Sequence, residues 1–137
     1  MDIANLNKKV DLNEGHWVED IPGNEGLRLK VRSSNYKPFR VATAGLARRS
    51  PKKLQSDEGL LEFTADAGGP LAEHILLDWD GVKSGGKSVK YDPKIARGIL
   101  VADDDHGIGA KFRRAVEWAA DQVADQLASS TKEAEGN

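Results

Sequence analysis

The chain alternates apolar and basic residues without exception over Leu27-Arg28-Leu29-Lys30-Val31-Arg32. Successive side chains of a β-strand point to opposite faces, so this pattern predicts a strand with one buried face and one solvated face. A shorter segment, residues 16–20, lies upstream, and the turn-forming residues 22–26 separate the two. We therefore predict a β-hairpin over about residues 16–32.

Beyond this hairpin, apolar residues recur every three or four positions, which is typical of amphipathic helices. The first helix is predicted over residues 38–49, because Pro38 suits a first helical turn. Ser50-Pro51 interrupts the pattern, since proline cannot donate a hydrogen bond inside a helix. A second helical segment follows from Pro51, and we expect Gly68-Gly69 to stop it.

Three further helices are predicted in the second half of the chain. Pro70 opens the first, which we expect over residues 71–79 because its apolar side chains fall on one helical face. Asp92-Pro93 supplies an N-cap and a first helical residue for the second, which should end near Leu100. The last helix is predicted over residues 108–128, and its apolar face comprises Ile108, Phe112, Ala115, Ala119, Val123 and Leu127.

A chain of 137 residues is long enough to bury one hydrophobic core and too short for two independent ones. We predict an α+β fold, mostly α-helical, with a single globular domain over residues 14–128. Residues 1–13 are polar and lack periodicity, which indicates a flexible N-terminal arm. Residues 129–137 form a polar tail that we expect to be disordered.

Composition excludes several classes of protein. The chain has no cysteine, which rules out a disulfide framework and thiolate chemistry, and no apolar run approaches the ~20 residues that cross a bilayer. We therefore expect a soluble, cytoplasmic protein. Residues 1–55 carry eleven Lys and Arg against six Asp and Glu, whereas the remainder carries nine against sixteen. This split predicts either a nucleic-acid face or a dipolar surface that docks on an oppositely charged partner or copy.

One segment matches the phosphate-loop template in every fixed position, namely Gly81-Val82-Lys83-Ser84-Gly85-Gly86-Lys87-Ser88. A phosphate loop needs a helix that starts within it, because the free amides of the helix N-terminus hold the phosphates. Here Asp92-Pro93 places the helix start too late. We therefore predict a loop or a second small hairpin, with no nucleotide site and no cofactor.

Nothing else in the sequence predicts catalysis or metal binding. The three histidines, His16, His74 and His106, are far apart and lack metal-ligand spacing. The acids of residues 103–105 lack the glutamate that closes a calcium loop, so we expect one of them to cap the last helix. We find no serine or thiol nucleophile in its usual frame, and we predict that the protein is not an enzyme.

The candidate contact residues are a basic patch and two tryptophans. They are Arg48, Arg49, Lys52, Lys53, Trp79 and Trp118. The basic patch can hold phosphates, but no helix-turn-helix spacing follows it and the isoelectric point is about 5.9, which favours a surface that faces protein. Tryptophan is more often a core residue, although a partly exposed Trp118 at the edge of its helix would indicate a protein contact.

The order of these features resembles the tail assembly chaperones of long-tailed, siphovirus-type bacteriophages and prophages. The likeness covers most of residues 15–128. It rests on the motif Gly-x-Trp-Val-Glu at residues 15–19, Leu-Lys-Val-Arg-Ser at 29–33, Leu-Ala-Glu-His-Ile-Leu-Leu-Asp-Trp-Asp-Gly-Val at 71–82, and Lys-Ser-Val-Lys-Tyr-Asp-Pro at 87–93 with the helix that follows.

This resemblance implies a protein of the host cytoplasm that coats the tape measure protein, recruits major tail subunits and is absent from the finished virion. The family offers no catalytic residues, and self-association remains open. Two alternatives stay beside it. One is a structural tail or connector protein that is retained in the particle, and the other is a small nucleic-acid-binding regulator that uses the basic patch.

Overall fold

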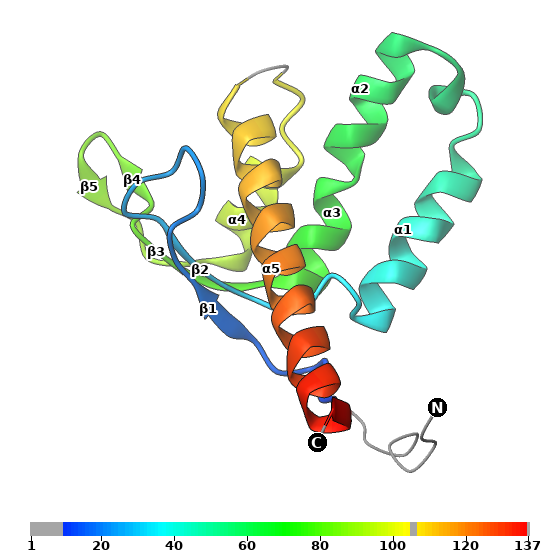
Figure 1. Cartoon of the computed structure of the whole chain (residues 1–137). Helices are drawn as coiled ribbons and strands as arrows, with labels where there is room; N and C mark the ends of the chain where they lie inside the picture. The colour runs from blue at the N-terminus through cyan, green and yellow to red at the C-terminus, as the bar shows by residue number, and fades with distance from the viewer. Residues whose placement is uncertain (1–9, 105–106, 137) are drawn as a thin grey trace.

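The computed structural model describes residues 10–104 and 107–136, with side chains as far as Ser129. Three short strands form one antiparallel sheet in the order β1-β2-β3, with helices around it (Figure 1). The strands are β1 (His16–Val18), β2 (Arg28–Val31) and β3 (Leu76–Asp80). The helical elements are α1 (Lys37–Arg49), η2 (Lys53–Gln55), α2 (Asp57–Asp66), α3 (Gly68–Pro70), η3 (Leu71–Ile75), α4 (Pro93–Leu100) and α5 (Ile108–Gly136). The predicted fold class, α+β and mostly α-helical in a single domain, is confirmed.

The N-terminal hairpin forms as predicted, because β1 and β2 pair antiparallel. Leu29 and Val31 are fully buried, whereas Arg28 and Lys30 are partly exposed, in agreement with the alternation of the sequence. Of the predicted N-terminal arm, residues 1–9 lie outside the described part of the chain. At its end the Asn13 carbonyl accepts a hydrogen bond of 2.8 Å from the side chain of Arg32.

The predicted helix over residues 71–79 is wrong in its second half. Leu71–Ile75 forms one π-helical turn, η3, but the chain from Leu76 onward is the strand β3, which pairs with the other edge of β2. This pairing satisfies backbone groups that β2 would otherwise leave open. It also buries Leu76 and Trp79. Pairing between distant segments therefore overrides the local helical spacing.

Gly68-Gly69 does not stop the second helical segment, contrary to prediction. The chain stays helical through α2, α3 and η3. A Cβ on Gly68 would collide with the carbonyl oxygen of Leu100 at the end of α4, and the Arg97 guanidinium lies over Gly69. These glycines therefore let α3 pass directly beside α4.

Three helix positions agree with prediction. α1 begins within one residue of the expected start, α4 begins at Pro93, and α5 begins at Ile108. The last helix does not end at Ala128 as predicted, because α5 continues to Gly136. No proline or glycine interrupts residues 129–135, and several of these residues are good helix formers.

α5 is the central helix of the core. It contacts β1 and β2 on one side and α4 and η3 on another. Its predicted apolar residues Phe112, Ala115, Ala119 and Val123 are buried, together with Val116 and Ala120. Of the other two predicted residues, Leu127 is partly buried against the core, whereas Ile108, the first residue of the helix, is 76% exposed.

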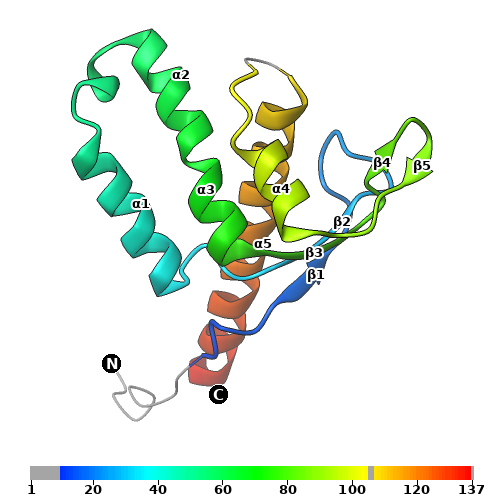
Figure 2. The same cartoon turned by 180° about the vertical axis from the view of Figure 1, so that it is seen from behind.

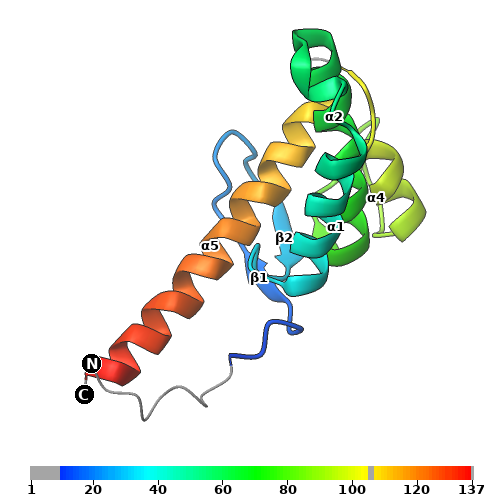
Figure 3. The same cartoon turned by 90° about the vertical axis from the view of Figure 1, so that its right-hand side faces the viewer.

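Two hairpins extend from opposite sides of this core (Figures 1 and 2). On one side lies the short β-hairpin of β4 (Lys83–Ser84) and β5 (Lys87–Ser88). On the other, α1, η2 and α2 form what we call the helical projection (residues 37–66). The C-terminal half of α5 runs away from this projection (Figure 3). Among the described helices, none is both long enough and apolar enough to cross a membrane.

Candidate functional site

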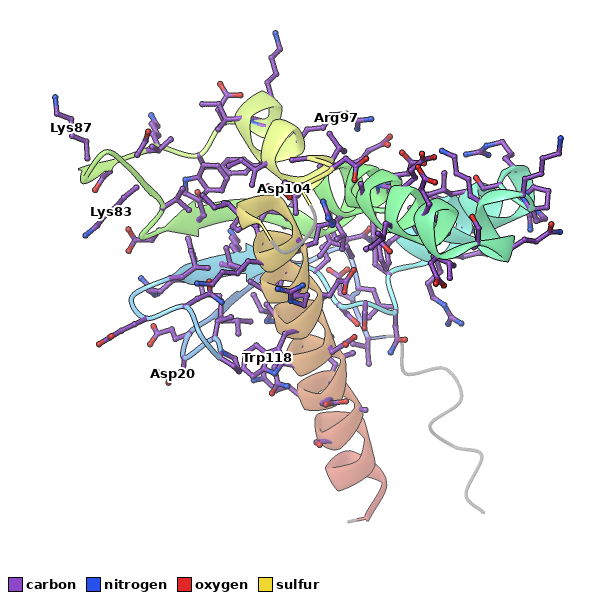
Figure 4. All side chains as sticks on the ribbon, turned by 90° about the horizontal axis from the view of Figure 1, so that it is seen from above. Asp20, Lys83, Lys87, Arg97, Asp104 and Trp118 are labelled. Carbon is purple, nitrogen blue, oxygen red and sulfur yellow. The ribbon has the colours of Figure 1, made fainter. Side chains whose placement is uncertain are left out.

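The segment that matches a phosphate loop is a β-hairpin. β4 and β5 pair antiparallel, and Gly85 and Gly86 between them both have positive φ, which a tight hairpin turn requires. The next helix, α4, begins only at Pro93, where the Asp92 carboxylate caps it. No helix therefore starts within residues 81–88. The two labelled lysines of this hairpin, Lys83 and Lys87, point away from the body of the molecule (Figure 4).

Asp104 caps the last helix, as predicted for an acid of this cluster. Its carboxylate accepts hydrogen bonds from the Gly109 amide at 2.9 Å and the Ala110 amide at 3.2 Å. These bonds, the one from Gly109 above all, lower the pKa of Asp104. Asp105 and His106 lie outside the described residues. Within the described part of the chain, no group of three or more side chains could hold a metal ion.

Trp79 is a core residue, so the prediction that it contacts a partner is corrected. Because it lies in β3, its side chain points inward and is buried. The indole N–H donates a hydrogen bond of 2.8 Å to the Val89 carbonyl, and the ring meets Tyr91 and Phe112 edge to face. Trp79 therefore stabilises the fold and is not exposed to a partner.

Trp118 is at the edge of the apolar face of α5, where the sequence places it. It is half-buried, and it lines a hollow of about 390 Å³ together with residues 21–24, Lys111 and Arg114. In Figure 4 the side chain lies on the same side of the molecule as Asp20, at the start of the β1–β2 loop. Trp118 therefore stays a candidate contact residue.

The four residues of the predicted basic patch differ in their surroundings, because within the described part of the chain one of them is paired with acids and three are not. Arg48 and Arg49 are the last residues of α1, and Lys52 is exposed in the turn that follows. Lys53 is already paired, since its ammonium lies 2.8 Å from Asp66 and 3.8 Å from Glu62 of α2. The hydrogen bond to Asp66 raises the pKa of Lys53. The remaining three cations have no ion-pair partner among the described residues.

A cleft of about 440 Å³ lies between α1 and the helical run of α2, α3 and η3. Val41, Ala42 and Leu46 give the α1 wall its apolar surface, and Pro70 lies in the opposite wall. The cleft exists because α1 packs loosely: its only buried residue is Gly45. A helix that buries so little of itself leaves apolar surface for another molecule.

The cleft carries opposite charges on its walls. Arg48 and Arg49 of α1 and Arg97 of α4 line it, and so do Asp66 and Glu73. None of these three arginines forms an ion pair with a described acid. A partner with both apolar and charged side chains can therefore find complementary groups there.

The helical projection also concentrates exposed apolar side chains. Eight large apolar residues are exposed in the described part of the chain, and four belong to this projection. These four are Val41, Leu54, Leu60 and Leu61. Exposed apolar side chains concentrated on one part of a molecule are typical of a surface that contacts another protein.

Two further arginines, outside the predicted basic patch, occupy positions that the sequence does not predict. Arg113 is buried, and one guanidinium nitrogen donates to the carbonyls of Leu100 and Ala102, both at 2.8 Å. Arg97 reaches over Gly69 into the cleft. One signal was available for Arg113, because Val116 and Ala120 follow it by three and seven residues, which is the spacing of one helical face. No signal was available for Arg97.

Comparison with known proteins gives one family. A search of the curated proteins and a search of the solved structures found no match. The family model described as YdaY prophage protein matches residues 35–137, which include α1, the cleft and α5. This match spans three quarters of the chain, and the protein therefore belongs to the YdaY prophage protein family.

Proposed function

We propose that this prophage protein is a tail assembly chaperone. It binds the tape measure protein of its own phage in the host cytoplasm, helps to recruit major tail subunits, and leaves before the virion is complete. The observation that best supports the proposal is the helical projection, which exposes Val41, Leu60 and Leu61 and whose helix α1 lines a cleft with apolar and charged side chains. The likeness of residues 15–128 to tail assembly chaperones supports it independently.

The proposed binding mode is a client helix laid against the helical projection. Long amphipathic helices aggregate when their apolar faces meet water, and a chaperone protects them by covering those faces. Leu61 is 47% exposed and Val41 is 57% exposed, so both can be covered by a client without disturbing the core. The charges of Arg48, Arg49 and Glu73 at the cleft then fix the orientation of the client.

Co-expression with the tape measure protein tests the proposal. We expect the client to be soluble with this chain and mostly insoluble without it. The variant Leu60→Ser/Leu61→Ser should lose the effect, because losing two apolar contacts removes about 3 kcal/mol of binding, or about 100-fold in affinity. Ile95→Ser is the matched control, since Ile95 is 46% exposed on α4, outside the projection.

The outcomes separate this proposal from its alternatives. If the client is equally soluble with and without the chain, the chaperone proposal is wrong. Detection of the chain in purified particles would favour a structural tail or connector protein instead. DNA binding that survives moderate salt and is lost when Arg48, Arg49 and Lys52 are neutralised would favour a nucleic-acid-binding regulator.

A further inference from the structure

One face of α1 is basic, apolar at its centre and uncovered. Arg40, Ala44 and Arg48 are spaced four residues apart, so they form one row along the helix, and all three are exposed. Val41 lies beside them and is 57% exposed. A shallow hollow of about 580 Å³ runs along this face. No acidic residue occurs between Lys37 and Ser56, so the charge of the row is not neutralised by sequence neighbours.

α5 carries a row of the same spacing and opposite charge. Glu117, Asp121 and Asp125 are also four residues apart and exposed. Between Ala115 and Ser129 the helix contains no Lys or Arg. The Glu117 side chain is exposed, but neighbouring protein atoms crowd its carboxyl group, and this crowding together with the Asp121 charge raises the pKa of Glu117. Arg113 and Arg114, one helical turn before it, act in the opposite direction.

The two rows match in length. Arg40 to Arg48 and Glu117 to Asp125 are each eight residues apart, which is about 12 Å along a helix. Two helices laid side by side would therefore bring two arginines opposite two carboxylates. Half-buried Trp118 flanks the acidic row as Val41 flanks the basic row, so an apolar contact can lie beside the charge pairs.

The rows do not neutralise each other within one molecule. No ion pair between α1 and α5 occurs among the described residues. The C-terminal half of α5, which begins just after Asp121 and carries Asp125, also runs away from the helical projection (Figure 3). Both rows are therefore available to a second molecule with the complementary charge.

We propose that the protein self-associates through contact between the basic face of α1 in one copy and the acidic face of α5 in a second copy. The same chain supplies both surfaces, so the partner is present wherever the protein is made. Exposed ion pairs are individually weak and are screened by salt, so the association is reversible and strongest at low ionic strength. This inference does not depend on the chaperone proposal.

A charge exchange between two variants tests the contact. Arg40→Glu/Arg48→Glu makes both rows acidic. Asp121→Lys/Asp125→Lys leaves the α1 row basic and gives the α5 row two lysines against the remaining Glu117, so that both rows carry a net positive charge. In sedimentation velocity at low salt, we expect wild type to form species larger than the monomer and each variant alone to be monomeric. An equimolar mixture of the two variants should regain the larger species, because each supplies the charge that the other lacks. High salt should return wild type to the monomer.

The matched control reverses two lysines elsewhere. Lys83→Glu/Lys87→Glu makes the same change in net charge on the β4–β5 hairpin, and it should associate like wild type. Wild type that stays monomeric at low salt up to its solubility limit would overturn the proposal. A variant mixture that stays monomeric, or a control that loses association as fully as the α1 variant, would also overturn it. Far-UV circular dichroism confirms that each variant is folded before it is measured.

Discussion

Arg113 shows how a charged side chain can belong to the core. Its guanidinium lies at the C-terminal end of α4, where it donates to carbonyls that have no partner inside that helix. The negative end of the helix dipole also favours a cation there. Arg113 of α5 is therefore a charged residue that joins the two helices through its hydrogen bonds to the end of α4.

The first prediction concerns this residue. Arg113→Ala should lower the free energy of unfolding by about 2–3 kcal/mol, because the buried carbonyl of Leu100 and the partly buried carbonyl of Ala102 lose a charged donor. Urea denaturation measures the change. Arg114→Ala is the matched control, since Arg114 is the exposed neighbour and should cost about 0.5 kcal/mol or less. Equal losses for the two variants would contradict the assigned role.

The capping role of Asp104 makes the stability of the protein depend on pH. Its pKa is lowered by the hydrogen bonds from the Gly109 and Ala110 amides, so its contribution to stability is present above the unfolded pKa, about 3.9, and is lost as pH falls through the folded value. Asp104→Asn should therefore lower the Tm at neutral pH, and the difference from wild type should shrink below about pH 4. Asp103→Asn, at the exposed neighbouring acid, should leave the Tm nearly unchanged. A difference that stays constant between pH 7 and pH 3 would argue against the capping role.

The two candidate tryptophans show what sequence can and cannot resolve for a single residue. Trp79 and Trp118 both lie in segments with helical spacing, and either could have faced a partner. Trp79 is buried because its segment is the strand β3, which directs the side chain into the core. Trp118 lies in α5, a helix whose apolar face the sequence predicts correctly, and it stays at the edge of that face. The spacing of apolar residues therefore predicts whether a side chain is buried or exposed only when the segment is correctly predicted as a helix or a strand.

The glycines of α3 and α4 test how closely these two helices pack. Gly68→Ala should destabilise the protein by about 1–3 kcal/mol, because its Cβ would meet the Leu100 carbonyl oxygen. Gly98→Ala, also in a helix, meets nothing within 4 Å and should stabilise the protein by about 0.5–1 kcal/mol. Thermal unfolding of both variants measures the contrast. A neutral Gly68→Ala would mean that α3 and α4 are not in close contact.

Elements with local signals are the ones that the sequence predicts well. The β1–β2 hairpin follows from alternation and turn residues, and the start of α4 follows from Asp92-Pro93. β3 and the continuous helix through Gly68 could not be predicted in this way, because both depend on partners distant in sequence. β3 pairs with a strand about 50 residues upstream, and Gly68 contacts a carbonyl about 30 residues downstream. Local spacing carries no information about either contact.

The whole molecule separates a packed body from an exposed projection. The core is built from the sheet, η3, α4 and α5, whereas α1 and α2 expose both apolar and charged side chains. The uneven charge of the chain is visible in the sequence, and three of the cations of its basic part, Lys37, Arg40 and Arg48, line one face of α1. The cleft was not predictable, because its walls come from segments as far apart as Val41 and Arg97.

Hydrogen–deuterium exchange on the chain alone and in complex with the tape measure protein tests the proposed function most directly, because it locates the bound surface. If the helical projection is that surface, binding should slow exchange in residues 37–66 and leave the β4–β5 hairpin unchanged. Slower exchange confined to another part of the chain, or no change in residues 37–66 on adding the client, would contradict the account.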